Sequence, residues 1–322
     1  MRKIGIGRGL HSYHHFSLWR TFFTELGFEV VLSSQTDKEI VNRGVRLAPA
    51  ELCLPVKVFL GQVEELLERA ELVFIPRMVC RRLHRDFYFG CPKAIALPDL
   101  VRAIFGSKER FLELVIDQQV QADETGFVNC AQVLGISRAQ ARAAFVQAIR
   151  AEAVAEQRLK QGANPADFWQ GESVIFRERF EAKGTKIGVI GHPYLIYDEY
   201  ISLSLLKILT ELGVEPAVPF VTVEELEAEA GRGNALNWFY ELELIARAQR
   251  LIREPGVKGL LLVSSFACGT APVVNEVIRR EIAEQAGLPM LTLLFDEHSG
   301  ETGLRTRVES FVDLLGSARA KL

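Results

Sequence analysis

A largely apolar run, residues 259–267, ends at Cys268 and a glycine. Such a short run between turn residues is typical of a strand that is buried on both faces of a parallel sheet. The next residues carry apolar side chains at helical spacing, and Pro272 falls in the first turn, where its missing N–H costs nothing. The pattern therefore predicts Cys268 between the carboxyl end of a central strand and the start of a helix, where open α/β sheets bind ligands.

The order strand, helix, strand occurs twice along the chain. Its strands are predicted at residues 3–8, 29–33, 186–191 and 216–220, and its helices at residues 16–26 and 201–212. Residues 24–30 (Thr-Glu-Leu-Gly-Phe-Glu-Val) and 210–216 (Thr-Glu-Leu-Gly-Val-Glu-Pro) align almost letter for letter. We interpret this as a duplicated βαβ unit, which predicts right-handed crossovers, parallel sheets and a cleft between the halves.

The segment between the two copies has a mostly helical pattern. Residues 138–161 form an amphipathic stretch rich in Ala, Arg, Gln and Glu, which we expect to bridge the domains. The predicted fold class is α/β, with an N-terminal domain at 1–107, a helical connector at 108–182 and a C-terminal domain at 183–322. Further helices are predicted at about 56–69, at 234–252 and at 304–315, and one more begins near residue 98. Further strands are predicted at 72–76 and 289–295, and the range 77–91 is expected to be a loop.

Composition narrows the class of protein. The 322 residues are 48% apolar with a net charge of −3, which predicts a compact chain without a nucleic-acid or membrane-surface patch. No apolar run reaches the length that spans a bilayer, and the first residues resemble a strand and not a signal peptide, so we expect a cytoplasmic protein. Five cysteines, an odd number, argue against a disulfide framework and leave metal binding, catalysis or inert burial.

The cysteines differ in their predicted surroundings. Cys53, Cys91 and Cys268 each precede a predicted helix, a position that lowers a thiol pKa, and a Cys-Pro pair is common among cluster ligands. Cys80 follows the predicted strand 72–76 and is a candidate fourth ligand, whereas Cys130 lies in the helical connector. The competing interpretation is that each is an inert core residue, because free cysteine is among the most buried residue types.

The histidines offer a competing metal site. His11, His14 and His15 follow the first predicted strand, and His298 follows the last one, but their spacing matches no recurrent zinc pattern.

The segment 296–303 offers acid–base groups at a strand end. We expect it to line the same cavity as Cys268, with Glu297 or His298 binding a ligand or moving a proton, while capping of the next helix is the alternative role. The glycines of residues 5–9 match a dinucleotide-binding loop only weakly, and the chain lacks the P-loop pattern for ATP.

Several motifs together resemble a known family. They are Ile-Gly-Ile-Gly-Arg-Gly-Leu at 4–10, Phe-Phe-Thr-Glu-Leu-Gly-Phe-Glu-Val at 22–30, Cys-Leu-Pro-Val-Lys at 53–57, Phe-Ile-Pro-Arg at 74–77, Cys-Pro-Lys at 91–93, Leu-Pro-Asp at 97–99 and Asp-Glu-His-Ser-Gly-Glu-Thr-Gly-Leu-Arg-Thr-Arg at 296–307. In combination they resemble acyl-CoA dehydratase activase-related proteins, relatives of the 2-hydroxyacyl-CoA dehydratase and benzoyl-CoA reductase subunits.

The resemblance implies both fold and chemistry. It implies two flavodoxin-like, Rossmann-like domains that hold an iron–sulfur cluster, expected as [4Fe-4S], which a separate ATP-hydrolysing activator reduces. Its ligand positions fall on Cys53, Cys91 and Cys268, and leave open whether Cys80 is a fourth. The implied function is that of an electron-accepting component of a low-potential reductase or dehydratase system, which acts on an acyl-CoA or another small substrate. The alternative function is that of a non-catalytic scaffold or partner subunit whose cysteines are structural or bind zinc. The oligomeric state, a homodimer among the options, stays open.

Overall fold

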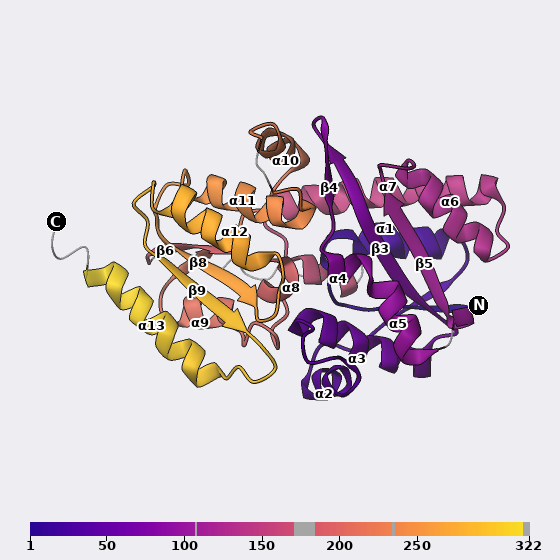
Figure 1. The fold of residues 1–322 in the computed structure, drawn as a ribbon, viewed down its shortest axis with the longest axis horizontal. Coiled ribbons are helices and arrows are strands. Elements are labelled where there is room, and N and C mark those ends of the chain that lie inside the picture. The colour runs from indigo at the N-terminus through magenta and orange to yellow at the C-terminus, as the bar shows by residue number, and fades with distance from the viewer. Residues whose placement is uncertain (107, 171–183, 234–235, 318–322) are drawn as a thin grey trace. The chain divides into compact units, whose positions relative to one another are not determined.

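The computed structural model describes residues 1–106, 108–170, 184–233 and 236–317. The chain divides into two compact units. Unit 1 comprises Met1–Ile175 with Asn237–Phe239, and unit 2 comprises Phe176–Leu236 with Tyr240–Leu322. Each unit is an α/β structure built on its own largely parallel sheet, so the predicted fold class is confirmed (Figure 1).

The sheet of unit 1 has the strand order β2-β1-β3-β4, and β5 also pairs with β3. The strands are β1 (Lys3–Ile6), β2 (Glu29–Leu32), β3 (Leu72–Leu83), β4 (Asp86–Phe89) and β5 (Phe111–Asp117). All pairs are parallel except β3–β4, which is antiparallel. The helices are α1 (Ser12–Glu25), α2 (Lys38–Leu47), α3 (Leu54–Arg69), α4 (Pro92–Ile95), α5 (Leu97–Phe105), α6 (Asp123–Val133) and α7 (Arg138–Lys160).

Two strands of unit 1 differ from the sequence prediction. The range 77–91, expected as a loop, is the hairpin of β3 and β4, and Figure 1 shows it projecting from the rest of the sheet. The range 108–182, expected as mostly helical, contains β5 before α6 and α7. Aromatic side chains fill the core between this sheet and α1: the rings of Trp19 and Phe23 each lie 5.0 Å from that of Phe74.

The sheet of unit 2 has the order β7-β6-β8-β9, and all its pairs are parallel. Its strands are β6 (Lys186–Ile190), β7 (Glu215–Ala217), β8 (Val257–Ser265) and β9 (Met290–Phe295). Its helices are α8 (Pro193–Ile196), α9 (Leu205–Glu211), α10 (Val223–Ala230), α11 (Phe239–Leu251), α12 (Ala271–Val277) and α13 (Glu301–Ser317), and a π-helical turn, Ile278–Ala283, continues α12. Part of the helix predicted at 234–252 falls on residues 234–235, outside the described residues.

The order β2-β1-β3-β5 in unit 1 is the order β7-β6-β8-β9 in unit 2, element for element. The registers agree as well, because Gly5 faces Val73 of β3 and Gly188 faces Leu260 of β8. The expected duplication therefore extends beyond the one βαβ unit seen in the sequence, to four strands.

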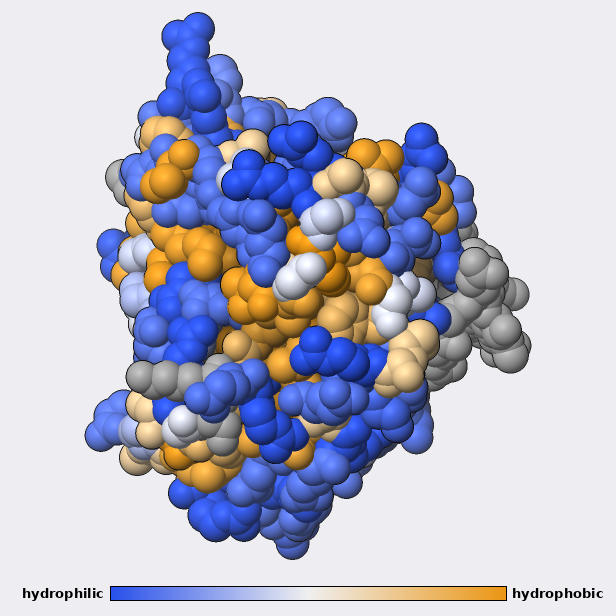
Figure 2. Space-filling model, turned by 90° about the vertical axis from the view of Figure 1, so that its right-hand side faces the viewer, coloured by the Kyte–Doolittle hydropathy of each residue, from blue (hydrophilic) through white to orange (hydrophobic). Residues whose placement is uncertain are grey.

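The surface of the molecule is mixed in character. The face at the α6 and β5 end carries an apolar area bordered by polar side chains (Figure 2). In the described part of the chain, no helix is both long and apolar enough to cross a membrane.

Candidate functional site

Cys53 is the N-cap residue of α3. Its carbonyl oxygen accepts hydrogen bonds from the backbone N–H groups of Val56 and Lys57, at 3.0 and 3.2 Å, and its side chain is nearly buried. Because α3 is the crossover helix that leads into β3, its first turn lies at the carboxyl edge of the sheet of unit 1. The predicted place of Cys53, ahead of a helix, is confirmed.

Cys91 is the N-cap residue of α4 and follows β4. Cys80 pairs with Phe89 on one side and with Asp117 of β5 on the other, so β4 lies on the side of β3 where β1 lies. As β4 runs antiparallel to β3, the chain returns toward the carboxyl end of β1 and there presents Cys91.

A hydrogen bond joins the loops of Cys53 and Cys91. Lys93 Nζ donates to the carbonyl oxygen of Glu51 at 2.8 Å, and each of these residues is two positions from its cysteine. Arg77 donates to the carbonyl oxygen of Ile95 at 2.8 Å and so holds α4 against β3. The structure thus brings these two cysteine loops together at one edge of a single sheet.

Lys57 is a buried cation near Cys53. It lies one helical turn after Cys53, on the same face of α3, and its exposed fraction is only 4%. An ammonium group near a thiolate favours the charged form of the sulfur. Sequence reasoning did not single out Lys57, since lysine is mostly exposed and only the inward face of α3 reveals the exception.

Cys80 differs from the expectation. It lies within β3, which continues to Leu83, and not after a strand that ends at residue 76. The side chain is 2% exposed, and its Sγ donates to the carbonyl oxygen of Arg81 at 3.8 Å. Burial, together with the nearby carboxylate of Asp117, raises the pKa of the Cys80 thiol.

The residues after Cys80, expected as part of the loop from 77 to 91, form the β3–β4 hairpin. Arg81 is only partly exposed: it lies 3.6 Å from a carboxylate oxygen of Asp123 and 5.5 Å from the ring centroid of Phe239. At the tip, Arg82, His84 and Arg85 are exposed. The exposed basic side chains of this segment therefore lie at the hairpin tip.

Cys268 follows β8 in unit 2 and precedes α12, as predicted. Its Sγ lies 3.7 Å from the hydroxyl of Thr270, which in turn hydrogen-bonds the carboxylate of Glu241 on α11. His192, after β6, places Nε2 3.9 Å from the same carboxylate. Thr270, Glu241 and His192 are all buried. Sequence reasoning missed Glu241, because nothing in the pattern of α11 separates it from exposed glutamates.

The segment after β9 forms a tight turn. Ser299 Oγ donates to Asp296 Oδ1 at 2.8 Å, and the backbone N–H of His298 donates to the same oxygen at 3.0 Å. Glu297 is partly exposed and His298 is exposed. Helix α13 begins at Glu301 and not near residue 304, so its first turn includes Thr302. Because Ser265 of β8 pairs with Phe295 of β9, this turn and the Cys268 loop leave the same edge of the sheet.

Asp117 of unit 1 is the counterpart of Asp296. Each directly follows the last apolar residue of the strand that pairs with β3 or β8. Each also accepts a hydrogen bond from the backbone N–H two residues later, at 3.1 Å for Asp117 and 3.0 Å for Asp296. The duplication therefore includes the turn at this edge, which argues that Asp296 serves the shape of the turn.

The three histidines near the N-terminus lie at α1, where His11 is the N-cap residue and His14 and His15 belong to the first turn. His15 Nδ1 lies 3.0 Å from a carboxylate oxygen of Glu152 on α7. Burial raises the pKa of Glu152 to about 7. In the described residues, no three His, Cys, Asp or Glu side chains are grouped so that they could hold a metal ion.

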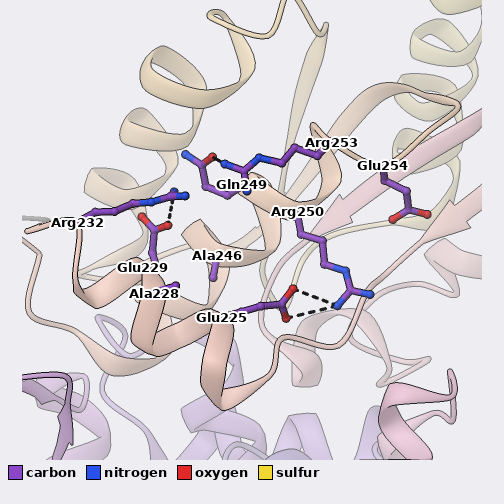
Figure 3. Close-up of a pocket in the computed structure, with 9 residues that line it drawn as sticks. All are labelled: Glu225, Ala228, Glu229, Arg232, Ala246, Gln249, Arg250, Arg253 and Glu254. Atoms are coloured by element: carbon purple, nitrogen blue, oxygen red, sulfur yellow. Dashed lines mark hydrogen bonds and ion pairs between the residues drawn. The ribbon is translucent and has the colours of Figure 1, made fainter.

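The remaining cysteine and a surface cavity stand apart from these residues. Cys130 is buried in α6, and burial raises the pKa of its thiol to about 12, which fits an inert core residue. A cavity of about 460 Å³ lies between α10 and α11 (Figure 3). Its arginines Arg232 and Arg250 are already paired, with Glu229 and Glu225, and it contains none of the predicted site residues.

A comparison with curated proteins gave no match to the chain. Among family models, that of the CoA enzyme activase uncharacterised domain matches residues 3–220. The matched range contains Cys53, Cys80 and Cys91, and it agrees with the resemblance to acyl-CoA dehydratase activase-related proteins. As the match spans about two thirds of the sequence, the chain belongs to the CoA enzyme activase uncharacterised domain family.

Proposed function

We propose that this protein is the iron–sulfur component of an ATP-dependent, low-potential reductase or dehydratase system. It accepts electrons from a separate ATP-hydrolysing activator and passes them to, or uses them on, a substrate of the acyl-CoA class. The observation that carries the proposal is the junction of the Cys53 and Cys91 loops through the Lys93–Glu51 hydrogen bond at one edge of a parallel sheet. Membership of the activase family supports an activase-type system and a dehydratase partner.

Cysteine is the chemical type of ligand that an iron–sulfur cluster takes, although in the described residues no three potential ligands are grouped around a metal position. Thiolates are the usual ligands of such clusters, and Cys53, Cys91 and Cys268 would hold it. We propose that the ammonium group of Lys57, which is 4% exposed and one helical turn after Cys53, offsets part of the negative charge that thiolates bring into a protein interior. When bound, the cluster would supply low-potential electrons. Glu297 and His298 are the groups proposed to bind a substrate or move a proton.

The test is metal analysis of protein that is purified without oxygen. We expect iron and sulfide in near-equal amounts, and a marked loss of both in Cys91→Ser and in Cys53→Ser. Cys130→Ser is the matched control, because Cys130 is a buried thiol of unit 1 that lies within a helix. Iron content that is equal in all three variants and the wild type would refute the ligand assignment.

The alternative is a scaffold subunit whose cysteines bind zinc or are structural. Thiolate sets bind zinc as readily as iron, so the observation that favours this alternative is the same pair of loops. Zinc without sulfide, with the same loss in Cys91→Ser, would establish a zinc site. A metal-free protein that still binds its dehydratase partner would establish the scaffold.

A further inference from the structure

Three side chains at the loop after β1, those of Gln62, Arg8 and Trp169, carry polar atoms without a hydrogen-bonding partner. The loop contains Gly7, Arg8 and Gly9 and leads into α1. Its backbone is anchored, since the N–H of Arg8 donates to Ser33 Oγ at 3.0 Å and Ser12 Oγ donates to the carbonyl oxygen of Gly7 at 2.5 Å. The backbone is therefore held firmly, while polar atoms of Gln62 and Arg8 have no partner.

Gln62 on α3 is the first of these side chains. Its exposed fraction is 0%, yet neither Oε1 nor Nε2 has a hydrogen-bond partner in the structure. The amide is aimed at the loop, because Oε1 lies 3.0 Å from where a Cβ of Gly7 would be and 2.9 Å from where a Cβ of Gly9 would be. A buried amide without partners is destabilising, and such a group in a native structure is expected where a ligand completes its hydrogen bonds.

Arg8 is the second side chain. Its Nε is buried and lacks a partner, and among the described residues no carboxylate forms an ion pair with its guanidinium. The guanidinium lies over the ring of Trp169 at 5.5 Å, and the indole Nε1 of Trp169 is also buried without a partner. The nearby carboxylate of Glu65 is already bound by Ser34 and Arg69. Burial lowers the pKa of Arg8, so its cation is poorly compensated.

We propose that the loop of Gly7 to Gly9 is a binding site for the phosphate group of a small molecule, with Arg8, Gln62 and Trp169 as hydrogen-bond donors. These residues offer three unused donors and a positive charge, which suit the oxygens of a phosphate group. The one unused acceptor, Gln62 Oε1, suits the P–OH of hydrogen phosphate or a sugar hydroxyl. The site does not depend on the cysteines or on a cluster.

The position of the loop supports this assignment independently. The strand order β2-β1-β3 places the end of β1 where the direction of strand addition reverses, which is where doubly wound sheets bind ligands. The positive end of the α1 dipole points at the same loop. The first N–H groups of α1 are not free to donate, because Ser12 and Tyr13 donate to the carbonyl oxygens of Gly9 and Leu10. The side chains must therefore make the contacts.

The experiment measures phosphate binding by calorimetry and by the thermal midpoint, against sodium chloride of equal ionic strength. We expect inorganic phosphate to bind and to raise the midpoint of the wild type. Arg8→Gln should weaken binding by about tenfold or more, because a charge-assisted hydrogen bond is lost. Gln62→Glu should abolish binding, because a carboxylate replaces the amide donor. Arg20→Gln, which removes an exposed arginine of α1, should bind as the wild type does.

Gln62→Leu separates a ligand site from a structural amide. Removing the unsatisfied amide should raise the midpoint of the ligand-free protein while removing the response to phosphate. A response to phosphate that is the same in Arg8→Gln, Gln62→Leu and Arg20→Gln would overturn the proposal, as would the absence of any response in the wild type to every probe tried.

The probes also identify the source of the phosphate group. ADP, CoA and dephospho-CoA are titrated beside inorganic phosphate. Tighter binding of CoA than of dephospho-CoA assigns the site to the 3′-phosphate, and tighter binding of ADP than of either assigns it to a nucleotide pyrophosphate. Binding of inorganic phosphate alone assigns it to the free anion.

Discussion

Burial and charge divide the cysteines of unit 1 into two kinds. Cys53 and Cys91 cap helices at the sheet edge, whereas Cys80 and Cys130 lie in the interior of a strand and a helix. Burial raises the thiol pKa of both interior cysteines. A thiol that resists deprotonation is a poor metal ligand, because the thiolate is the form that binds.

We therefore predict that Cys80→Ser keeps the iron of the wild type. The serine hydroxyl can donate to the carbonyl oxygen of Arg81 as the thiol does, so the strand should tolerate the change. Iron content and the visible absorption spectrum check the prediction against Cys91→Ser. A loss as large as that of Cys91→Ser would instead make Cys80 the fourth ligand.

Glu152 gives unit 1 a specific pH dependence. Its Oε1 lies 3.0 Å from Nδ1 of His15, and its Oε2 accepts a hydrogen bond from the backbone N–H of Leu18 at 3.2 Å. Burial raises its pKa from 4.5 to about 7, although Arg81 and the Leu18 N–H act in the opposite direction. Well below pH 4.5 the carboxyl group is protonated in both the folded and the unfolded state, so it does not change the free energy of unfolding with pH. As the pH rises from 4.5 to about 7, the unfolded state ionises first, so this group makes the fold progressively less stable.

Glu152→Gln should remove this contribution. The prediction is a smaller fall in the free energy of unfolding between about pH 5 and about pH 8 than the wild type shows, measured by urea unfolding. Glu156→Gln, on the same helix, is the comparison: it should flatten the slope only slightly, because the charge of Glu156 is the smallest of the causes that raise the pKa of Glu152. An unchanged slope in Glu152→Gln would show that its carboxylate is ionised throughout this range.

At the scale of elements, α2 and α3 pack closely enough to require glycine. A Cβ on Gly44 would lie 1.7 Å from the carbonyl oxygen of Lys57, and a Cβ on Gly61 would lie 2.1 Å from that of Ile40. These contacts fix α2 against the half of α3 that carries Cys53 and Lys57. The close packing of α2 against α3 therefore helps to fix the position of Cys53, a candidate metal ligand.

Gly44→Ala should lower the thermal midpoint, with a loss of about 1–3 kcal/mol from overpacking. Gly303→Ala is the matched control in helix α13, because a Cβ at that position would have no atom within 4 Å and alanine favours a helix. The control should leave the midpoint unchanged or raise it. If Gly44→Ala were as stable as its control, the two helices would have room to separate.

The sequence predicted elements well where one periodicity dominates. The buried run of β8 and the amphipathic stretch at 138–161 are clear signals, and the structure has β8 and α7 where these signals place them. The hairpin was missed because polar side chains in 81–86 look like a loop, although β3 continues there by pairing with β4. The places of the candidate ligands ahead of helices were predictable, but the Lys93–Glu51 bond and the burial of Glu241 depend on contacts between distant segments.

At the scale of the whole molecule, the β3–β4 hairpin is the feature that breaks the duplication. β8, the counterpart of β3, ends at Ser265 and has no returning strand among the described residues, whereas β3 runs on and pairs with β4. The backbone N–H of Phe89 also donates to the carbonyl oxygen of Asn237 at 2.7 Å, so β4 has neighbours on both sides. The β3–β4 hairpin is therefore an integral part of unit 1, and its tip exposes the basic side chains of Arg82, His84 and Arg85.

We predict that this tip contacts the acidic surface of the activator. Arg82→Glu with Arg85→Glu should slow activator-dependent reduction, because reversed charge opposes the electrostatic steering of an encounter. The wild-type rate should fall with added salt, and the rate of the double variant should respond less or in the opposite sense.

Arg150→Glu, a charge reversal at an exposed position of α7, is the control and should leave the rate unchanged. Arg81 is left intact in this test, since its contacts with Asp123 and Phe239 make it part of the hairpin's attachment. Equal rates for the double variant and the control at low salt would mean that the tip is a solvated loop end and that docking occurs elsewhere.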